Sequence, residues 1–212
     1  MFTGIIKGIG TVKEVRAKNN FSTLIITLPS KLSLDLEIGA SISIDGVCLT
    51  VTTIDNEDIL FDVMGETLRL TTLGELKSNS KVNIERSIKD GTEVGGHIIS
   101  GHVDTTAEII SIETPENNYV VTFSLPESWR KYIFNKGFIS VNGASLTLTN
   151  VDRQKGTFSI WLIPETLRMT TFGQKKVGDR VNIEVERNTQ VMVDTTISFL
   201  EEHLTQLTQN LK

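Results

Sequence analysis

The chain has 212 residues, of which 39% are hydrophobic and 22% charged, enough apolar material for one large domain or two ordinary ones. A formal net charge of −5 argues against a nucleic-acid-binding protein, because such proteins usually carry a basic excess. No apolar run approaches the roughly 20 residues that a membrane-spanning helix needs.

The start of the sequence, Met1-Phe2-Thr3-Gly4, leads directly into strand-like residues, without the basic and apolar regions of a signal peptide. With one cysteine (Cys48) and three histidines (His97, His102 and His203), the chain has too few ligands of these types for a usual structural zinc site. We therefore expect a cytoplasmic protein without disulfides or a bound metal, and without a nucleic-acid or membrane partner.

Short segments rich in β-branched residues follow one another through the first half, separated by turn dipeptides such as Asp45-Gly46. They predict strands at residues 11–15, 22–28, 40–44, 49–54, 59–63 and 81–86. The stretch 86–96 contains Lys-Asp-Gly and Gly-Gly and reads as a loop between two units. The first unit is therefore predicted to be almost entirely strand.

The second half offers a matching set of strands at residues 107–112, 119–125, 138–141, 146–151, 158–162 and 180–185. A Glu-Thr-Leu-Arg segment in each half favours one short helix per unit. About six short strands per unit predict an all-β protein of tandem six-stranded antiparallel barrels of Greek-key type, because closure removes exposed edges. An open two-sheet sandwich is the alternative that the number of strands leaves open.

The two halves repeat one another in three blocks of sequence. Residues 42–52 recur at 139–149, residues 64–72 recur at 163–171, and the tetrad Val-Asn-Ile-Glu at 82–85 returns unchanged at 181–184. Gly4 matches Gly101 in the same register that aligns Gly46 with Gly143. We therefore expect an N-terminal barrel over 1–96, a C-terminal barrel over 97–188 and a tail over 189–212.

The tail has a different pattern from the rest of the chain. Its apolar residues recur with spacings of 4-3-4-3-4, at Val193, Ile197, Leu200, Leu204, Leu207 and Leu211. This spacing is typical of a helix that associates with other helices. An amphipathic helix lying on its own barrel is the alternative. The narrow seam, which has no copy after the first barrel, favours an oligomerisation helix.

Several motifs occur in the order found in riboflavin synthase: the start at 1–6, Asn/Asp-Gly-x-Cys/Ser-Leu-Thr in both halves, Gly-Gly-His-x-x-x-Gly-His-Val-Asp at 95–104, and Ile-Pro-Glu-Thr-Leu at 163–167. The chain resembles this family over its whole length. The resemblance implies a homotrimer held partly by the tail, with each site between the N-terminal barrel of one subunit and the C-terminal barrel of a neighbour. It also implies association with lumazine synthase and no cofactor or metal.

The family converts two molecules of 6,7-dimethyl-8-ribityllumazine into riboflavin and 5-amino-6-ribitylaminouracil by transferring a four-carbon unit, the last step of riboflavin biosynthesis. The resemblance therefore implies a transferase. Two identical substrates need two similar pockets, which a duplicated barrel supplies. Bringing both substrates into one site makes a bimolecular step effectively unimolecular.

Cys48 and Ser145 occupy the same position of the repeat, and Thr50 and Thr147 lie two residues further on, on the same face of their strands. A lone cysteine is most often a small buried hydrophobe, and threonine is common in strands for its β-propensity alone. The resemblance instead places these residues in the ligand pockets. Because an ordinary thiol is mostly protonated at neutral pH, we interpret Cys48 as a pocket-lining or assisting group.

His102 is the predicted general acid or base, since a histidine changes charge near neutral pH. Its counterpart in the first copy is Ile5, so the barrel itself does not require a histidine there. The alternative is a structural role, which is more common for a lone histidine. Lys136 could offset negative charge on the pteridine or be a solvated turn residue. Glu186 and Asn142 stand where the family commonly has aspartate. His97 is assigned to the junction between the barrels, and His203 to the surface.

The resemblance gives catalytic roles to Cys48, His102, Ser145, Thr147 and Glu186. It places substrate contacts along both repeats, at Gly4, Ile5, Ile6, Ser41, Cys48, Leu49, Thr50, Asp62, Val63, Met64, Gly65, Glu66, Thr67, Gly101, His102, Val103, Lys136, Ser145, Leu146, Thr147, Ile163, Pro164, Glu165 and Thr166.

Two other functions fit a pair of barrels. One is a non-catalytic lumazine- or flavin-binding antenna protein, but such relatives lose the second pocket's motif and the associating tail. The other is an interaction module without a small ligand, which gives no reason for polar Cys/Ser and Thr side chains at equivalent positions. The synthase interpretation accounts for both features.

Overall fold

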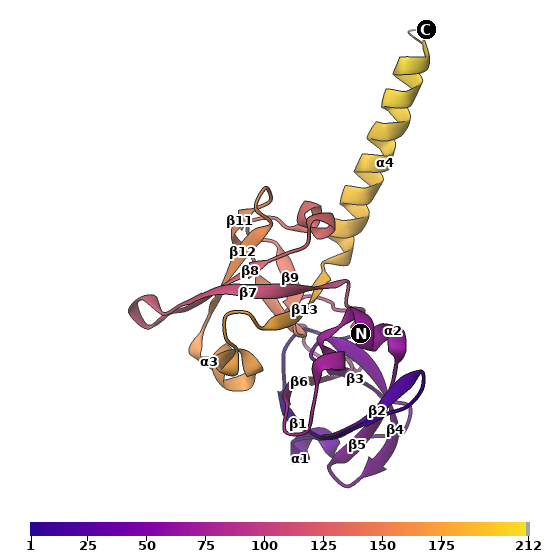
Figure 1. Cartoon of the computed structure of the whole chain (residues 1–212), viewed down its shortest axis with the longest axis vertical. Helices are drawn as coiled ribbons and strands as arrows, with labels where there is room; N and C mark the ends of the chain where they lie inside the picture. Colours follow the sequence, from indigo (N-terminus) through magenta and orange to yellow (C-terminus); the bar gives the residue numbers. More distant parts are fainter. Residues whose placement is uncertain (211–212) are drawn as a thin grey trace.

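The computed structural model describes residues 1–210, apart from the side chains of Asn117 and of residues 205–210. Two barrels lie next to each other, and one long helix projects from the second (Figure 1). Within the described residues, no helix combines the length and apolar character needed to cross a membrane. Among the described residues, strands make up most of the regular secondary structure, as the sequence predicts.

The first barrel is closed, with its antiparallel strands in the order β1-β2-β5-β4-β3-β6. Its strands are β1 (Gly8–Ala17), β2 (Phe21–Thr27), β3 (Ser41–Ile44), β4 (Val47–Asp55), β5 (Asp58–Met64) and β6 (Lys81–Arg86). Inward-facing apolar side chains such as Leu24, Ile42 and Phe61 are fully buried and fill its interior. The predicted closed barrel is confirmed for this half.

The second barrel has seven strands in the order β10-β9-β13-β7-β8-β12-β11. They are β7 (Thr105–Glu113), β8 (Tyr119–Ser124), β9 (Phe138–Val141), β10 (Ala144–Thr147), β11 (Thr149–Asp152), β12 (Thr157–Leu162) and β13 (Arg180–Val185). The single strand predicted at 146–151 is interrupted at Leu148. Asn150 adopts a left-handed conformation (φ 48°), which bends the chain and shifts its pairing with β12. The edge strands β10 and β11 are consecutive in the chain, so this sheet is nearly closed.

In each barrel a short helix follows the strand before the last, β5 in the first barrel and β12 in the second. The predicted Glu-Thr-Leu-Arg helices are α2 (Gly65–Leu70) and α3 (Pro164–Met169), and each leads into a 3-10 turn, η1 (Thr72–Glu75) and η4 (Thr171–Gln174). Proline at the first turn of α3 suits a position whose amide has no partner within the helix. The sequence patterns did not predict the remaining short turns, which are α1 (Ser30–Ser33), η2 (Pro115–Asn117) and η3 (Glu127–Tyr132).

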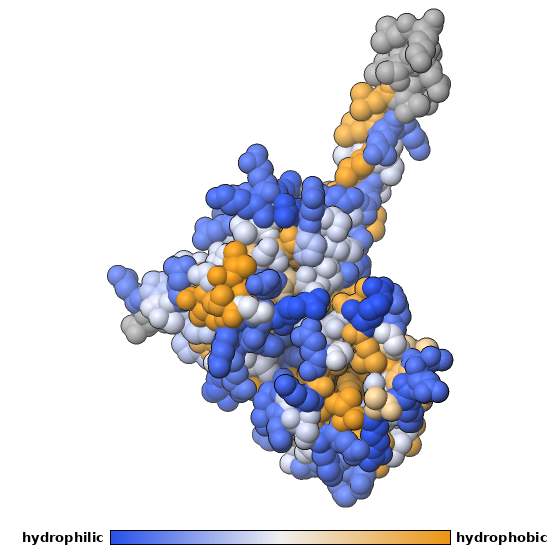
Figure 2. Space-filling view, viewed as in Figure 1, coloured by the Kyte–Doolittle hydropathy of each residue, from blue (hydrophilic) through white to orange (hydrophobic). Residues whose placement is uncertain are grey.

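The C-terminal helix α4 (Arg187–Asn210) contacts its own barrel near its start. Val193 packs against the second core, and Asp194 accepts hydrogen bonds from Lys131 and from the Tyr132 hydroxyl, both at 2.7 Å. Further along, α4 projects from the barrels and carries apolar side chains on its surface (Figures 1 and 2). Exposed large apolar side chains on α4 include Met192, Phe199, Leu200 and Leu204. The side chain of Leu207, and Leu211 altogether, lie outside the described residues.

The repeated tetrad joins the two barrels. Asn83 of β6 donates to the carbonyl of Asn142 (2.9 Å) and accepts from the amide of Thr171 (2.8 Å), both in the second barrel. Asn182 of β13 makes the equivalent two bonds to the first barrel. Because each asparagine crosses in the opposite direction, the two repeats face one another with approximate twofold symmetry.

Two glycines meet at this junction. A Cβ atom on Gly46 would lie 2.7 Å from the amide nitrogen of Gly143, and one on Gly143 would lie 2.9 Å from that of Gly46. Both residues also have positive φ angles, which glycine adopts without strain. The Asp/Asn-Gly dipeptides of the repeat therefore form turns and also allow the barrels to pack closely.

Candidate functional site

The segment that precedes each barrel crosses to the other barrel. The carbonyl of Gly4 accepts a hydrogen bond from the amide of Ser145 in β10, and the carbonyl of Gly101 accepts one from the amide of Cys48 in β4, both at 2.8 Å. Ile6 is buried in the core of the second barrel. The predicted Gly4 and Gly101 segments are thus exchanged between the repeats.

Glycine is required where these segments cross. Gly4 and Gly101 have φ angles of 76° and 81°, a region that disfavours other residues. A Cβ atom on either glycine would lie 2.5 Å from the Cβ of Ser145 or of Cys48, respectively. The exchanged backbone therefore lies directly against the two residues that the repeat makes equivalent.

Buried glutamates of the tetrads hold both segments in place. Glu85 accepts hydrogen bonds from the amide and hydroxyl of Thr3 (both 2.7 Å) and from the amide of Gly4 (3.0 Å). Glu184 makes the same three bonds to Ser100 and Gly101. Burial raises the pKa of Glu85, and the donated bonds partly offset this. The tetrad repeats unchanged because its asparagine joins the barrels and its glutamate fixes the crossing segments.

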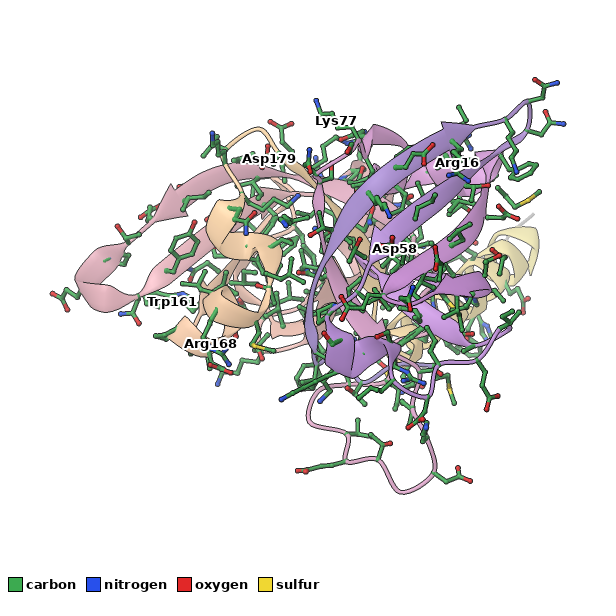
Figure 3. All side chains as sticks on the ribbon, turned by 90° about the horizontal axis from the view of Figure 1, so that it is seen from below. Arg16, Asp58, Lys77, Trp161, Arg168 and Asp179 are labelled. Atoms are coloured by element: carbon green, nitrogen blue, oxygen red, sulfur yellow. The ribbon has the colours of Figure 1, made fainter. Side chains whose placement is uncertain are left out.

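The second barrel carries a cavity of about 330 Å³ beneath the first crossing segment. We call it the C-site. It brings together seven residues predicted to bind substrate: Gly4, Ile5, Ile6, Ser145, Leu146, Glu165 and Thr166. Four further residues line it that the sequence did not indicate: Lys7, Ala144, Met169 and Thr170. Glu165 is paired at 2.6 Å with Arg168, one turn along α3 (Figure 3).

His97 lies beside the C-site and contacts Ser145. Its Nδ1 is 2.6 Å from the Ser145 hydroxyl oxygen, and its ring stacks on Phe138 with centroids 5.5 Å apart. Burial lowers the pKa of His97, and the negative charge of Glu186 partly opposes that effect. A neutral imidazole hydrogen-bonded to a hydroxyl can accept a proton through it. The structure therefore joins His97, which the sequence assigned to the junction, with the predicted residues Ser145 and Glu186.

Glu186 also caps the start of the C-terminal helix. Its carboxylate accepts hydrogen bonds from the amide and hydroxyl of Thr189 (both 2.7 Å) and from the amide of Asn188 (3.1 Å). Burial raises the pKa of Glu186, but these bonds outweigh it and hold the pKa below its ordinary value. A charged carboxylate at the N-terminus of a helix also suits the helix dipole. Glu186 thus connects the start of α4 with His97.

The equivalent place on the first barrel is formed around Cys48, and we call it the N-site (residues 41, 48–50, 62–67 and 101–103). Cys48 is half-buried under Gly101, and Thr50 pairs with Ser41 across β3 and β4. Val103 packs against the core of the first barrel, so the crossing segment is seated there. Ser41, Cys48 and Thr50 therefore lie on two paired strands, with the Gly101–Val103 segment supplied by the other repeat. Residues 62–67 lie at the end of β5, which pairs with β4, and at the start of α2.

Some predicted residues do not line the C-site cavity. Thr147, Ile163 and Pro164 are exposed near it, on β10 and at the start of α3. Lys136 is exposed in the turn before β9, with a φ angle of 67°. The equivalent residue of the first repeat is Gly39, which has a φ angle of 90°. The second repeat therefore places a lysine in a conformation that favours glycine.

Comparison with known proteins finds one family model and several riboflavin synthases that match most of the chain. The lumazine binding domain family matches residues 3–87 and 100–186. Riboflavin synthase of Escherichia coli (strain K12) is 48% identical over 92% of this chain and 91% of its own length, and that of Buchnera aphidicola subsp. Schizaphis graminum is 45% identical over 98% and 99%.

Riboflavin synthase of Bacillus subtilis (strain 168) is 40% identical over 88% of this chain and 85% of its own length. Among solved structures, LumP complexed with riboflavin has a TM-score of 0.80 and 26% identity, covering 88% of this chain and 100% of LumP. LumP complexed with 6,7-dimethyl-8-(1'-D-ribityl) lumazine has a TM-score of 0.79 and 25% identity, covering 88% and 99%.

Proposed function

Because the chain belongs to the riboflavin synthase family, we propose that it converts two molecules of 6,7-dimethyl-8-ribityllumazine into riboflavin and 5-amino-6-ribitylaminouracil. It would act as a transferase that moves a four-carbon unit from one substrate to the other. The two products together contain all atoms of the two substrates, so the reaction balances without an oxidant or a reductant.

The observation that carries this proposal is the pair of equivalent sites made by exchanged segments. Each barrel offers a polar residue, Cys48 or Ser145, beneath a glycine of the other repeat. The C-site cavity of about 330 Å³ is of the size that small-molecule pockets have. Two similar sites suit a reaction between two identical substrates, and they hold the substrates as neighbours rather than as free molecules.

The C-site also offers the proton transfer that the reaction needs. A proton must leave the methyl group at C7 of one lumazine, and neutral His97 can accept it through the Ser145 hydroxyl. Lys7 lines the same cavity, where its ammonium group can stabilise negative charge developing on the pteridine. We assign His97 and Ser145 to proton removal, beside the predicted roles of His102, Thr147 and Glu186.

For the two substrates to react, an N-site and a C-site must face each other. We propose that they come from neighbouring subunits of a homotrimer, held by α4, with barrels over 1–96 and 97–188 and the tail over 189–212. The exposed apolar side chains of Met192, Phe199 and Leu200 support this role of α4, because their burial between helices would stabilise an assembly. A cytoplasmic location stays a prediction from the sequence, and association with lumazine synthase stays a prediction from the resemblance.

Incubation of the purified protein with 6,7-dimethyl-8-ribityllumazine, followed by riboflavin fluorescence, tests the proposed function. We expect riboflavin and 5-amino-6-ribitylaminouracil in equal amounts. Lumazine binding without product would identify an antenna-type protein. The absence of both binding and product would indicate an interaction module.

Truncation after Asn188 is expected to abolish the trimer and lower riboflavin formation by at least a hundredfold, while both barrels stay folded. The deletion removes Thr189, which bonds to Glu186, and the apolar surface of α4. Light scattering reports the mass of the particle, circular dichroism reports the barrels, and riboflavin fluorescence reports activity. A fully active monomer would contradict the shared site.

Replacing Cys48 by serine is expected to leave turnover within about tenfold of the original, because we interpret Cys48 as a pocket-lining or assisting group. A tenfold change corresponds to about 1.4 kcal/mol of transition-state stabilisation. The bond between Cys48 and Gly101 uses the backbone amide, which serine retains. Steady-state rates with a parallel lumazine titration measure the effect. Complete loss of turnover with binding intact would instead show a covalent role for the thiol.

A further inference from the structure

Arg187, the first residue of α4, connects this helix with the crossing segment of the N-site. Its Nη1 donates to Asp104 Oδ1 at 2.8 Å and to Gln190 Oε1 at 2.6 Å. Its Nη2 donates to the carbonyl of His102 at 2.8 Å. One guanidinium group thus contacts both the first turn of the helix and the segment that covers Cys48.

Asp104 is well placed to hold Arg187. Only 9% of its side chain is exposed, compared with 37% for Arg187. Its Oδ2 accepts from the amide of Val185, and its own amide donates to the carbonyl of Ile183, both at 2.8 Å. The carboxylate is therefore fixed to β13, and the ion pair has a defined geometry rather than that of two mobile surface groups.

The N-site segment is thereby anchored at both ends. Glu184 holds Ser100 and Gly101, and the Asp104–Arg187 pair holds the other end. His102 lies between the two anchors, with its side chain exposed and its carbonyl bound to Arg187. The position of His102 therefore depends on the guanidinium group of Arg187.

The first repeat provides an internal comparison. Lys7 and Ile88 stand at the positions of Asp104 and Arg187, so these residues form no equivalent ion pair. The backbone bond is retained, because the amide of Lys7 donates to the carbonyl of Ile84 at 2.9 Å. Lys7 instead lines the C-site cavity. The second repeat therefore has a side-chain clamp that the equivalent residues of the first repeat cannot form, and the barrel itself does not require it.

We propose that Arg187 is a positioning residue for the N-site, which fixes the segment 101–103 against Cys48 from the first turn of α4 and so makes lumazine binding depend on that helix. This inference rests on the proposed function and deepens it. Arg187 acts through the carbonyl of His102 and the carboxylate of Asp104, without touching substrate. It would link the helix that holds the assembly to the site that binds substrate.

The test compares Arg187→Gln, Asp104→Asn and the double variant, with Arg187→Lys as the conservative replacement. Arg16→Gln is the matched control, because Arg16 lies on β1 of the first barrel (Figure 3) and pairs with Glu14 at 2.8 Å. We expect each clamp variant to raise the KM for lumazine about tenfold with kcat within about twofold, as the loss of one charge-assisted interaction predicts.

The double variant should have a KM for lumazine no higher than that of either single variant, since each substitution removes the same ion pair. Arg187→Lys should recover part of the loss, because an ammonium can reach Asp104 but lacks the planar fork that also binds His102 and Gln190. Light scattering should show every variant assembled like the original protein. The proposal would be overturned by an unchanged KM for lumazine in a folded Arg187→Gln variant, or by an equal rise of KM in Arg16→Gln. It would also be overturned if KM rose only in variants that form a smaller particle.

Titration of each variant with riboflavin, followed by fluorescence quenching, separates this proposal from the proposed function. An original protein that forms no riboflavin from lumazine would refute the synthase activity. The clamp would still be tested, because Arg187→Gln should weaken riboflavin binding about tenfold at one site. Equal riboflavin binding in the original protein and in Arg187→Gln would refute the clamp, whatever the activity.

Discussion

Replacing His97 by glutamine is expected to lower kcat for riboflavin formation by about a hundredfold, with lumazine binding changed by no more than a few-fold, because positioned acid–base groups contribute about 10²–10⁴. Glutamine can keep a hydrogen bond to the Ser145 hydroxyl but cannot take up its proton. Ser145→Ala should cause a comparable loss, and the double variant should add little, since the pair acts as one unit.

His102→Gln is the decisive companion variant, because the sequence places the acid–base role on His102 and the structure brings His97 to Ser145. We expect the larger loss of kcat in His97→Gln. If His102→Gln loses kcat and His97→Gln does not, proton removal belongs to His102 and the N-site. Single-turnover rates at saturating lumazine separate the chemical step from substrate binding.

The pH dependence of kcat gives a second measure of His97. Its neutral form is the base, so kcat should rise with pH through the pKa of His97 and stay level above it. Because burial lowers that pKa, the midpoint of the rise should lie below the ordinary histidine value of 6.5. Glu186→Gln removes a negative charge that favours the protonated ring, so the rise should move to still lower pH. A rise that moves to higher pH in this variant would contradict the assignment.

The strands could be predicted from the sequence because their signal is local. Alternating β-branched residues and Asp/Asn-Gly turns mark both barrels, and the first closes as expected. The break at Leu148 and the shifted pairing around Asn150 were missed, because asparagine permits a left-handed conformation but does not impose it.

The site was predicted less completely, because its defining contacts join residues far apart in the chain. The register of the repeat correctly makes Cys48 equivalent to Ser145. It cannot tell whether Gly4 covers its own barrel or the other one, since the same motifs would repeat in either arrangement. His97 is 48 residues from Ser145, and no local pattern distinguishes it from His102. Only the exchange of segments brings these groups together.

The junction between the barrels places Asp45 and Asn142 in equivalent surroundings. Asp45 Oδ1 accepts from the amide of Asn83 at 2.8 Å, and Asn142 Oδ1 accepts from the amide of Asn182 at 2.6 Å. Asp45 is only 3% exposed, and burial raises its pKa to about 6, although Lys175 partly offsets the effect. At neutral pH the first repeat therefore holds a buried carboxylate where the second uses an amide.

This carboxylate makes stability depend on pH. In the unfolded chain the group ionises near pH 3.8, and in the folded protein near pH 6. Between these values the folded state binds more protons, so the stability contributed by this group falls as pH rises from about 4 to 6. The full difference in pKa corresponds to a loss of about 3 kcal/mol in the free energy of unfolding, which is complete at pH 7 and above.

Asp45→Asn is therefore expected to raise the free energy of unfolding by about 1–3 kcal/mol at pH 8 and to have little effect at pH 4. The lower value allows for an unpaired amide donor, as in Asn142, whose Nδ2 is buried without a partner among the residues that the structure describes. For a chain of this size, Tm should rise by about 2–4 °C per kcal/mol. Asn142→Asp, which places a second carboxylate at the junction, should destabilise the protein with the same pH dependence. Thermal unfolding of the three proteins between pH 4 and 8 measures both effects. Equal stability of Asp45→Asn and the original protein at pH 8 would show that the junction tolerates the charge without cost.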